Sequence, residues 1–112
     1  MASLRNRVQL VGNLGMNPEI KSFDNGRKMA KFSLATNETF GVNGQERTET
    51  EWHTIIAWGK QAEIAEQHLK KGNEVAIEGR LTHRKYEDKN QQTRYFTEIV
   101  LGSYVVYPGL KK

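Results

Sequence analysis

The sequence contains no cysteine and only two prolines, Pro18 and Pro108, among its 112 residues. The lack of cysteine excludes disulfides, thiolate metal sites and cysteine nucleophiles. No stretch approaches the roughly 20 consecutive apolar residues that a membrane helix needs. The first residues also lack the apolar stretch of a signal peptide. We therefore expect a protein without a membrane span, located in the cytoplasm or in an organelle matrix.

Signs of catalysis are equally scarce. No Gly-Lys-Ser/Thr phosphate loop and no Gly-x-Ser-x-Gly nucleophile motif occurs. The three histidines, His53, His68 and His83, share no metal-ligand motif, and the two aspartates, Asp24 and Asp88, both lie in turn sequences. The sequence therefore predicts no enzyme, no metal site and no cofactor.

Charged residues of both signs are present, with a moderate excess of basic ones. The chain has 17 Lys and Arg against 13 Asp and Glu, a formal net charge of +4, and 37% of its residues are hydrophobic. That length and composition suit one small domain with a single core. We expect this domain to cover residues 1–107, followed by a short C-terminal end at 108–112.

Apolar residues alternate with polar ones along most of the chain, which is the period of half-buried strands. This pattern predicts five strands, at 5–14, 28–37, 48–58, 73–84 and 93–105. A further short strand is expected at 19–22. A hairpin turn joins it to the next strand, because Asn25 and Gly26 tolerate positive φ.

One segment, residues 60–71, has a helical spacing instead. It places Ala62, Ala65 and Leu69 on one stripe, and Gly72 suits the left-handed residue that follows a helix. The order is thus three strands, one helix and two strands.

A small antiparallel sheet exposes its edges unless it closes on itself. Gly12 and Gly79 lie inside strand patterns, where a barrel bends sharply. The sequence therefore predicts an all-β fold, a five-stranded OB-fold barrel with one helix between strands 3 and 4. Other small barrels remain alternatives.

Aromatic side chains occur at positions that a small core does not require, and basic residues lie near them. The four positions are Phe40, Trp52, Trp58 and Tyr86. Unpaired bases stack on aromatic rings, and Lys and Arg hold phosphates, so this combination favours single-stranded nucleic acid. Plain structural roles stay open: both tryptophans as core residues, Phe40 as a loop anchor, and Tyr86 as an ordinary strand residue.

Five short segments occur in a fixed order along the chain. They are Val8-Gln9-Leu10-Val11-Gly12-Asn13-Leu14-Gly15, Phe32-Ser33-Leu34-Ala35-Thr36, Thr50-Glu51-Trp52-His53, Val75-Ala76-Ile77-Glu78-Gly79 and Arg84-Lys85-Tyr86. Their order and spacing resemble the bacterial and mitochondrial single-stranded DNA-binding proteins, over roughly residues 4–101.

The resemblance implies an OB-fold homotetramer that wraps single-stranded DNA without sequence preference. It implies a role in DNA replication, recombination and repair, and a cytoplasmic, nucleoid-associated location. The implied DNA-binding residues are Phe40, Trp52, Trp58 and Tyr86 for base stacking and Lys21, Lys60, Lys71 and Arg84 for phosphate contacts. His53 matches a family histidine associated with subunit contacts.

The sequence also departs from the family pattern. Family members usually continue into a flexible linker with an acidic tip that recruits replication and repair enzymes, whereas this sequence ends in the basic Leu110-Lys111-Lys112. The resemblance therefore does not imply that this protein recruits client proteins. A tailless paralogue that acts as a primosome-accessory interaction module stays an alternative. An RNA-binding OB domain is another alternative, because nothing in the sequence shows whether a residue would recognise the 2′-hydroxyl that distinguishes RNA from DNA.

Overall fold

The computed structural model describes residues 5–106 of the chain. The expected domain end at 107 and the C-terminal end at 108–112 lie outside these residues. The described elements, in chain order, are β1 (Val8–Leu14), β2 (Glu19–Ser22), β3 (Lys28–Val42), β4 (Gln45–Trp58), α1 (Lys60–His68), β5 (Glu74–Glu87) and β6 (Thr93–Val106).

The strands form one sheet in the order β1-β5-β6-β4-β3-β2, and an additional pairing of β1 with β3 closes it. Five strands therefore make a closed barrel, and β2 pairs with β3 beside β1. This confirms the predicted OB-fold barrel. The helix lies between β4 and β5, which are the third and fourth strands of the barrel once the short β2 is left aside.

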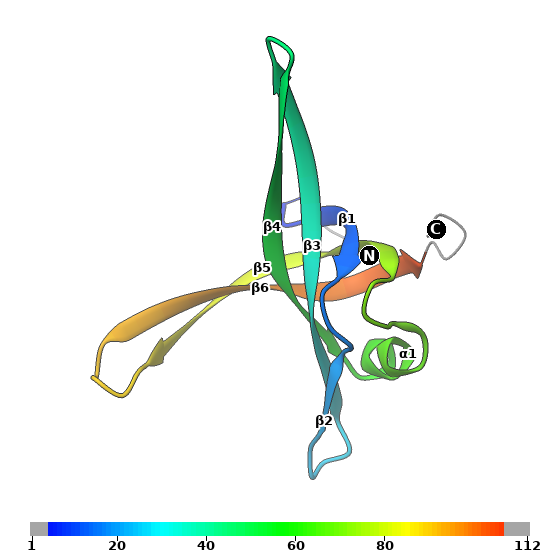
Figure 1. The fold of residues 1–112 in the computed structure, drawn as a ribbon. Helices are drawn as coiled ribbons and strands as arrows, with labels where there is room; N and C mark the ends of the chain where they lie inside the picture. Colours follow the sequence, from blue (N-terminus) through cyan, green and yellow to red (C-terminus); the bar gives the residue numbers. More distant parts are fainter. Residues whose placement is uncertain (1–4, 107–112) are drawn as a thin grey trace.

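Two of the pairings that close the barrel are short. β1 pairs with β3 through Asn13↔Ala35 and Leu14↔Leu34 alone, and the parallel pairing of β4 with β6 joins Ile55↔Ile99 and Ile56↔Val100. The antiparallel β3–β4 and β5–β6 pairings are far longer and continue beyond the barrel. Figure 1 shows these two hairpins projecting from the barrel in different directions.

The β3–β4 hairpin is longer than the sequence predicted. Its strands run on to a tight turn at Asn43 and Gly44, whose φ angles of 54° and 78° are those of a turn that matches the twist of a hairpin. Alternation does not reveal these strand ends, because side chains on both faces of the hairpin beyond the barrel are exposed.

The turn between β5 and β6 is organised by one carboxylate. The backbone N–H groups of Asn90 and Gln92 donate to Asp88 Oδ1, and Arg94 Nε donates to Asp88 Oδ2 at 2.9 Å. The hydrogen bond from Arg94, followed by that from the backbone of Gln92, holds the pKa of the Asp88 carboxyl below its ordinary value of 3.8. The carboxylate thereby fixes the end of this hairpin at neutral pH.

The helix ends earlier than predicted. α1 stops at His68, and Leu69 adopts an extended conformation that buries its side chain in the core. The next two backbone N–H groups donate to side chains, that of Lys70 to Asn73 Oδ1 at 2.7 Å and that of Lys71 to Asn17 Oδ1 at 2.8 Å. These asparagines replace the last helical turn, so the prediction of a helix to residue 71 was wrong. Gly72 has the predicted left-handed conformation, with a φ of 89°, but the helix cap is Leu69.

The barrel interior is filled by aliphatic side chains and one phenylalanine. The largest fully buried side chains are Phe32, Leu34, Ile55, Leu69 and Val75. Ala62 and Ala65, also buried, bring α1 against this cluster. At Gly12, β1 approaches β3 too closely for a side chain, because a Cβ there would overlap the carbonyl oxygen of Ala35.

Candidate nucleic-acid interface

β3 and β4 present one face to the core and the other away from it. The pairing register between them is uninterrupted, so the two faces can be read from alternation. Ala30, Phe32 and Leu34 belong to the core cluster together with Ile55 and Ala57. The opposite surface, here called the outer face, consists of β3 residues 29, 31, 33 and 35 and β4 residues 52, 54, 56 and 58.

Trp52 is an exposed side chain of the outer face. Its relative exposure is 61%, so the interpretation as a core residue is wrong for this ring. The ring lies against Gly15, just beyond β1, where a Cβ would overlap its Cζ3 atom. The absence of a side chain at Gly15 therefore allows the indole to approach the backbone while most of the ring stays in solvent.

Trp58 lies on the same face but in a different environment. Its ring is half-buried and stacks on Phe23, with 6.0 Å between centroids and 27° between planes. The guanidinium carbon of Arg27 lies 4.5 Å from the Trp58 centroid. Much of the Trp58 ring is thus in contact with protein groups, while Phe23 remains 39% exposed. The sequence predicted the turn at Asn25 and Gly26 but not the two side chains, Phe23 and Arg27, that flank it and contact Trp58.

Basic residues continue the outer face beyond β3. Lys21 on β2 is the register partner of Met29, which in turn is the partner of Trp58. Lys21 and Lys31 line one shallow hollow together with Met29. The structure therefore places Lys21 on the same face as Trp58, two strands away, with Met29 between them.

Arg84 and Tyr86 lie on one face of the β5–β6 hairpin. Tyr86 is 53% exposed, and both residues line an opening of about 310 Å³ with Lys85 and Phe96. Arg84 Nη2 makes an ion pair with Glu98 Oε2 at 2.8 Å. Among the described residues, Glu98 is the one buried charged side chain, whereas the Arg84 side chain stays 64% exposed. The buried carboxylate holds the guanidinium in place and leaves it accessible.

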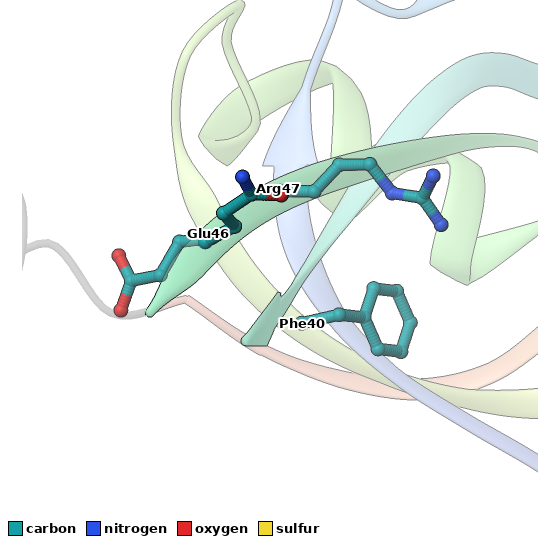
Figure 2. A pocket seen from close by; sticks show the side chains of 4 residues that line it. Phe40, Glu46 and Arg47 are labelled. Atoms are coloured by element: carbon teal, nitrogen blue, oxygen red, sulfur yellow. The ribbon is translucent and has the colours of Figure 1, made fainter. Parts of the chain in front are cut away.

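Phe40 lies on the β3–β4 hairpin, away from the other rings. It is 43% exposed and is the register partner of Arg47. Figure 2 shows the Phe40 ring and the Arg47 guanidinium extending to one side while the Glu46 carboxylate points the other way. Alternation places Phe40 on the opposite surface of the hairpin from Trp52. Residues 37–51 carry four acidic side chains, Glu38, Glu46, Glu49 and Glu51, against the single Arg47.

Lys60 and Lys71 flank the helix. Lys60 is the exposed first residue of α1, directly after Trp58 and Gly59. Lys71 is exposed in the turn that follows, where Asn17 holds its backbone near the end of β1. The eight predicted residues thus fall into a group around Trp58, a pair on β5, the separate Trp52, the distant Phe40 and the two lysines at the ends of the helix.

A comparison with known families identifies this arrangement. Residues 5–106 match the model of the family described as the single-strand binding protein family. The chain belongs to the single-strand binding protein family. Its structure is similar to a solved structure described as the Plasmodium falciparum SSB complex with ssDNA, with a TM-score of 0.84 and 33% sequence identity. That match covers 96% of this chain and 97% of the other. The resemblance noted in the sequence is thereby confirmed.

In this member of the single-strand binding protein family, His53 has a structural contact. His53 is half-buried, and its Nε2 lies 3.0 Å from Thr36 Oγ1. Within residues 5–106 no group of three or more His, Cys, Asp and Glu is arranged to hold a metal ion. Over the same range no helix has the length and apolar character to cross a membrane.

Proposed function

We propose that this chain binds single-stranded DNA without sequence preference and carries no catalytic activity. The observation that carries the proposal is Trp52, a large ring that is 61% exposed beside the barrel although a small core would gain from burying it. Membership of the single-strand binding protein family and the similarity to a protein solved with ssDNA support it.

In this proposal the rings and the cations have different tasks. Bases stack on Trp52 and Tyr86, because every base has a π-face and stacking is nearly independent of sequence. Trp58 acts through its stack, which presents Phe23 to the strand. Phe40 contributes less, because the acidic residues around it repel phosphates.

Phosphate contacts come from Lys21, Lys60, Lys71 and Arg84. Arg84 is held by the buried Glu98, so little side-chain freedom is lost when it binds a phosphate. We propose that this activity serves DNA replication, recombination and repair, in the cytoplasm and associated with the nucleoid. A pure protein-interaction module would not need aromatic side chains at all four positions, 40, 52, 58 and 86.

The direct test is a titration with poly(dT), followed by intrinsic tryptophan fluorescence at several salt concentrations. Binding through phosphates releases counterions, so log affinity should fall linearly with log salt, by about 0.7 per phosphate contact on a single strand. Arg84→Ala is expected to make this slope shallower by about 0.7 and to weaken binding equally for poly(dT) and poly(dC). Its folding is checked by thermal unfolding, because the variant leaves Glu98 buried without its partner.

A poly(dT) affinity that stayed constant between about 50 and 200 mM salt would contradict the proposal, because several phosphate contacts have a large effect over that range. The basic residues would then be a solvated surface, and the barrel would bind a different ligand.

We also propose that the protein assembles as a homotetramer. Val11 on β1 is 55% exposed, and residues 8–12 of that strand pair with β5 but with no second strand among the described residues. An apolar strand with a free edge is stabilised by pairing with a copy of itself. Sedimentation at micromolar concentration is expected to give about four times the 12.8 kDa chain mass. A monomer under these conditions would rule the assembly out.

A further inference from the structure

Phe96 on β6 lies within reach of two cations that come from different strands. The guanidinium carbon of Arg84 on β5 is 5.4 Å from its ring centroid, and Lys31 Nζ on β3 is 5.9 Å from it. Both distances allow an attraction between the charge and the ring. The ring is half-buried, so it is neither a core residue nor a freely exposed one. Three strands thus converge on one aromatic side chain.

The same ring forms one wall of the opening of about 310 Å³ that Tyr86, Lys85 and Arg84 also line. Arg84 is the register partner of Phe96, and Tyr86 is the partner of Arg94, so Tyr86 and Phe96 are diagonal neighbours on one face of the hairpin. Diagonal neighbours are about 7–8 Å apart. The two rings make no ring contact with each other and both line the opening, so a flat base can approach both of them.

The charged side chains that line this opening, Arg84 and Lys85, are both basic, and Lys31 lies near its Phe96 wall. Lys31 makes no ion pair with any described acidic side chain, although Glu19 is its register partner on β2. Arg84 has one carboxylate partner, Glu98, which is buried below it. Lys31 thus has no carboxylate partner among the described side chains and Arg84 has one, so both cations can still attract a phosphate.

We infer that Phe96, Tyr86, Lys31 and Arg84 form a subsite for one nucleotide unit of a single strand. The base lies against the rings of Phe96 and Tyr86, and its phosphate lies between Lys31 and Arg84. This inference rests on the proposed function. Because Lys31 belongs to the outer face, the subsite leads the strand from β3 and β4 onto the β5–β6 hairpin.

The experiment compares matched variants in the poly(dT) titration. Phe96→Leu removes the ring but keeps an apolar side chain, and it is expected to weaken binding about 5- to 150-fold, the range for one stacked base. Phe96→Tyr keeps the ring and is expected to bind within about twofold of the unmodified protein. The control is Tyr95→Leu, which changes the neighbouring ring on the opposite face of β6 and is expected to leave the affinity unchanged.

The phosphate part of the subsite has its own variant pair. Lys31→Gln is expected to make the salt slope shallower by about 0.7. Lys28→Gln makes the same charge change on the same strand, but Lys28 is bonded to Glu66 on the other face, so its slope should not change. Losses from Phe96→Leu and Lys31→Gln should not add fully in the double variant, because both residues bind the same nucleotide.

The subsite is overturned if Phe96→Leu binds as the unmodified protein does, if Phe96→Tyr is as weak as Phe96→Leu, or if Tyr95→Leu loses as much affinity. An unchanged salt slope for Lys31→Gln overturns the phosphate contact. Thermal unfolding shows that each variant is folded under the binding conditions. If the unmodified protein itself fails to bind poly(dT) at low salt, the proposed function fails, which is a different result from the failure of this subsite.

Discussion

Replacing Trp52 by alanine is expected to weaken binding of single-stranded DNA by about 1–3 kcal/mol, the value of one stacked base. The loss of folding stability should be much smaller than the 3–5 kcal/mol that removal of a buried aromatic ring costs. The physical reason is that Trp52 is 61% exposed and lies over Gly15 instead of inside the barrel. Poly(dT) titration and urea unfolding, both on the same variant, measure the two quantities.

Trp58→Ala provides the contrast. This ring is half-buried against Phe23 and Arg27, so its removal should cost more stability than the removal of Trp52.

The salt slope of Trp52→Ala should equal that of the unmodified protein, because stacking releases no counterions. A Trp52→Ala variant with lost stability and intact binding would refute the binding role of this ring.

Replacing Gly12 by alanine is expected to destabilise the fold by about 3 kcal/mol or more, at the upper end of what overpacking costs. The added Cβ would overlap the Ala35 carbonyl oxygen and lie 3.3 Å from Leu34 Cγ. β1 cannot move away freely, because Gly12 is also the register partner of Val75 on β5. Pairing with both β3 and β5 therefore prevents the β1 backbone from relieving the clash. Urea unfolding measures the resulting loss of folding free energy.

Gly41→Ala is the matched control, since it makes the same chemical change in a strand of the same sheet. Its Cβ would lie 3.6 Å from Glu46 Cγ, an ordinary contact on the exposed hairpin. Its stability should change by no more than about 0.5 kcal/mol. Equal losses for the two variants would mean that the close approach at Gly12 does not determine the effect.

The barrel was predictable because its strands are half-buried. Inside the barrel one face of each strand contacts the core, so the alternation of apolar and polar residues reveals the strands. The close approach of β1 to β3 is visible in the sequence as a glycine, Gly12, inside a strand pattern. The ends of β3 and β4 were not predictable in this way, since no face is buried there. The helix end was missed because Asn17, a residue far away in the sequence, takes the Lys71 backbone N–H.

The candidate site was predictable in its residue types but not in its arrangement. Alternation gives Trp52 and Trp58 the same face, yet one is exposed and the other is stacked, because Phe23 and Arg27 arrive from the β2–β3 turn. The role of Phe96 was not predicted, since it depends on contacts with Lys31 and Arg84 from two other strands. Predicting that Phe40 lies on the face opposite Trp52 requires the register between β3 and β4, which is set by the turn at Asn43 and Gly44.

The two short pairings of the barrel divide it into halves. Cutting β1 from β3 and β4 from β6 leaves β2-β3-β4 on one side and β1-β5-β6 on the other, each held by long ladders of backbone hydrogen bonds. Such halves are natural units of cooperative local unfolding. Trp52 reaches across one boundary to Gly15, and Lys31 reaches across the other to Phe96. A strand of DNA bound at both places would therefore clamp the halves together and raise the free energy of opening the barrel between them.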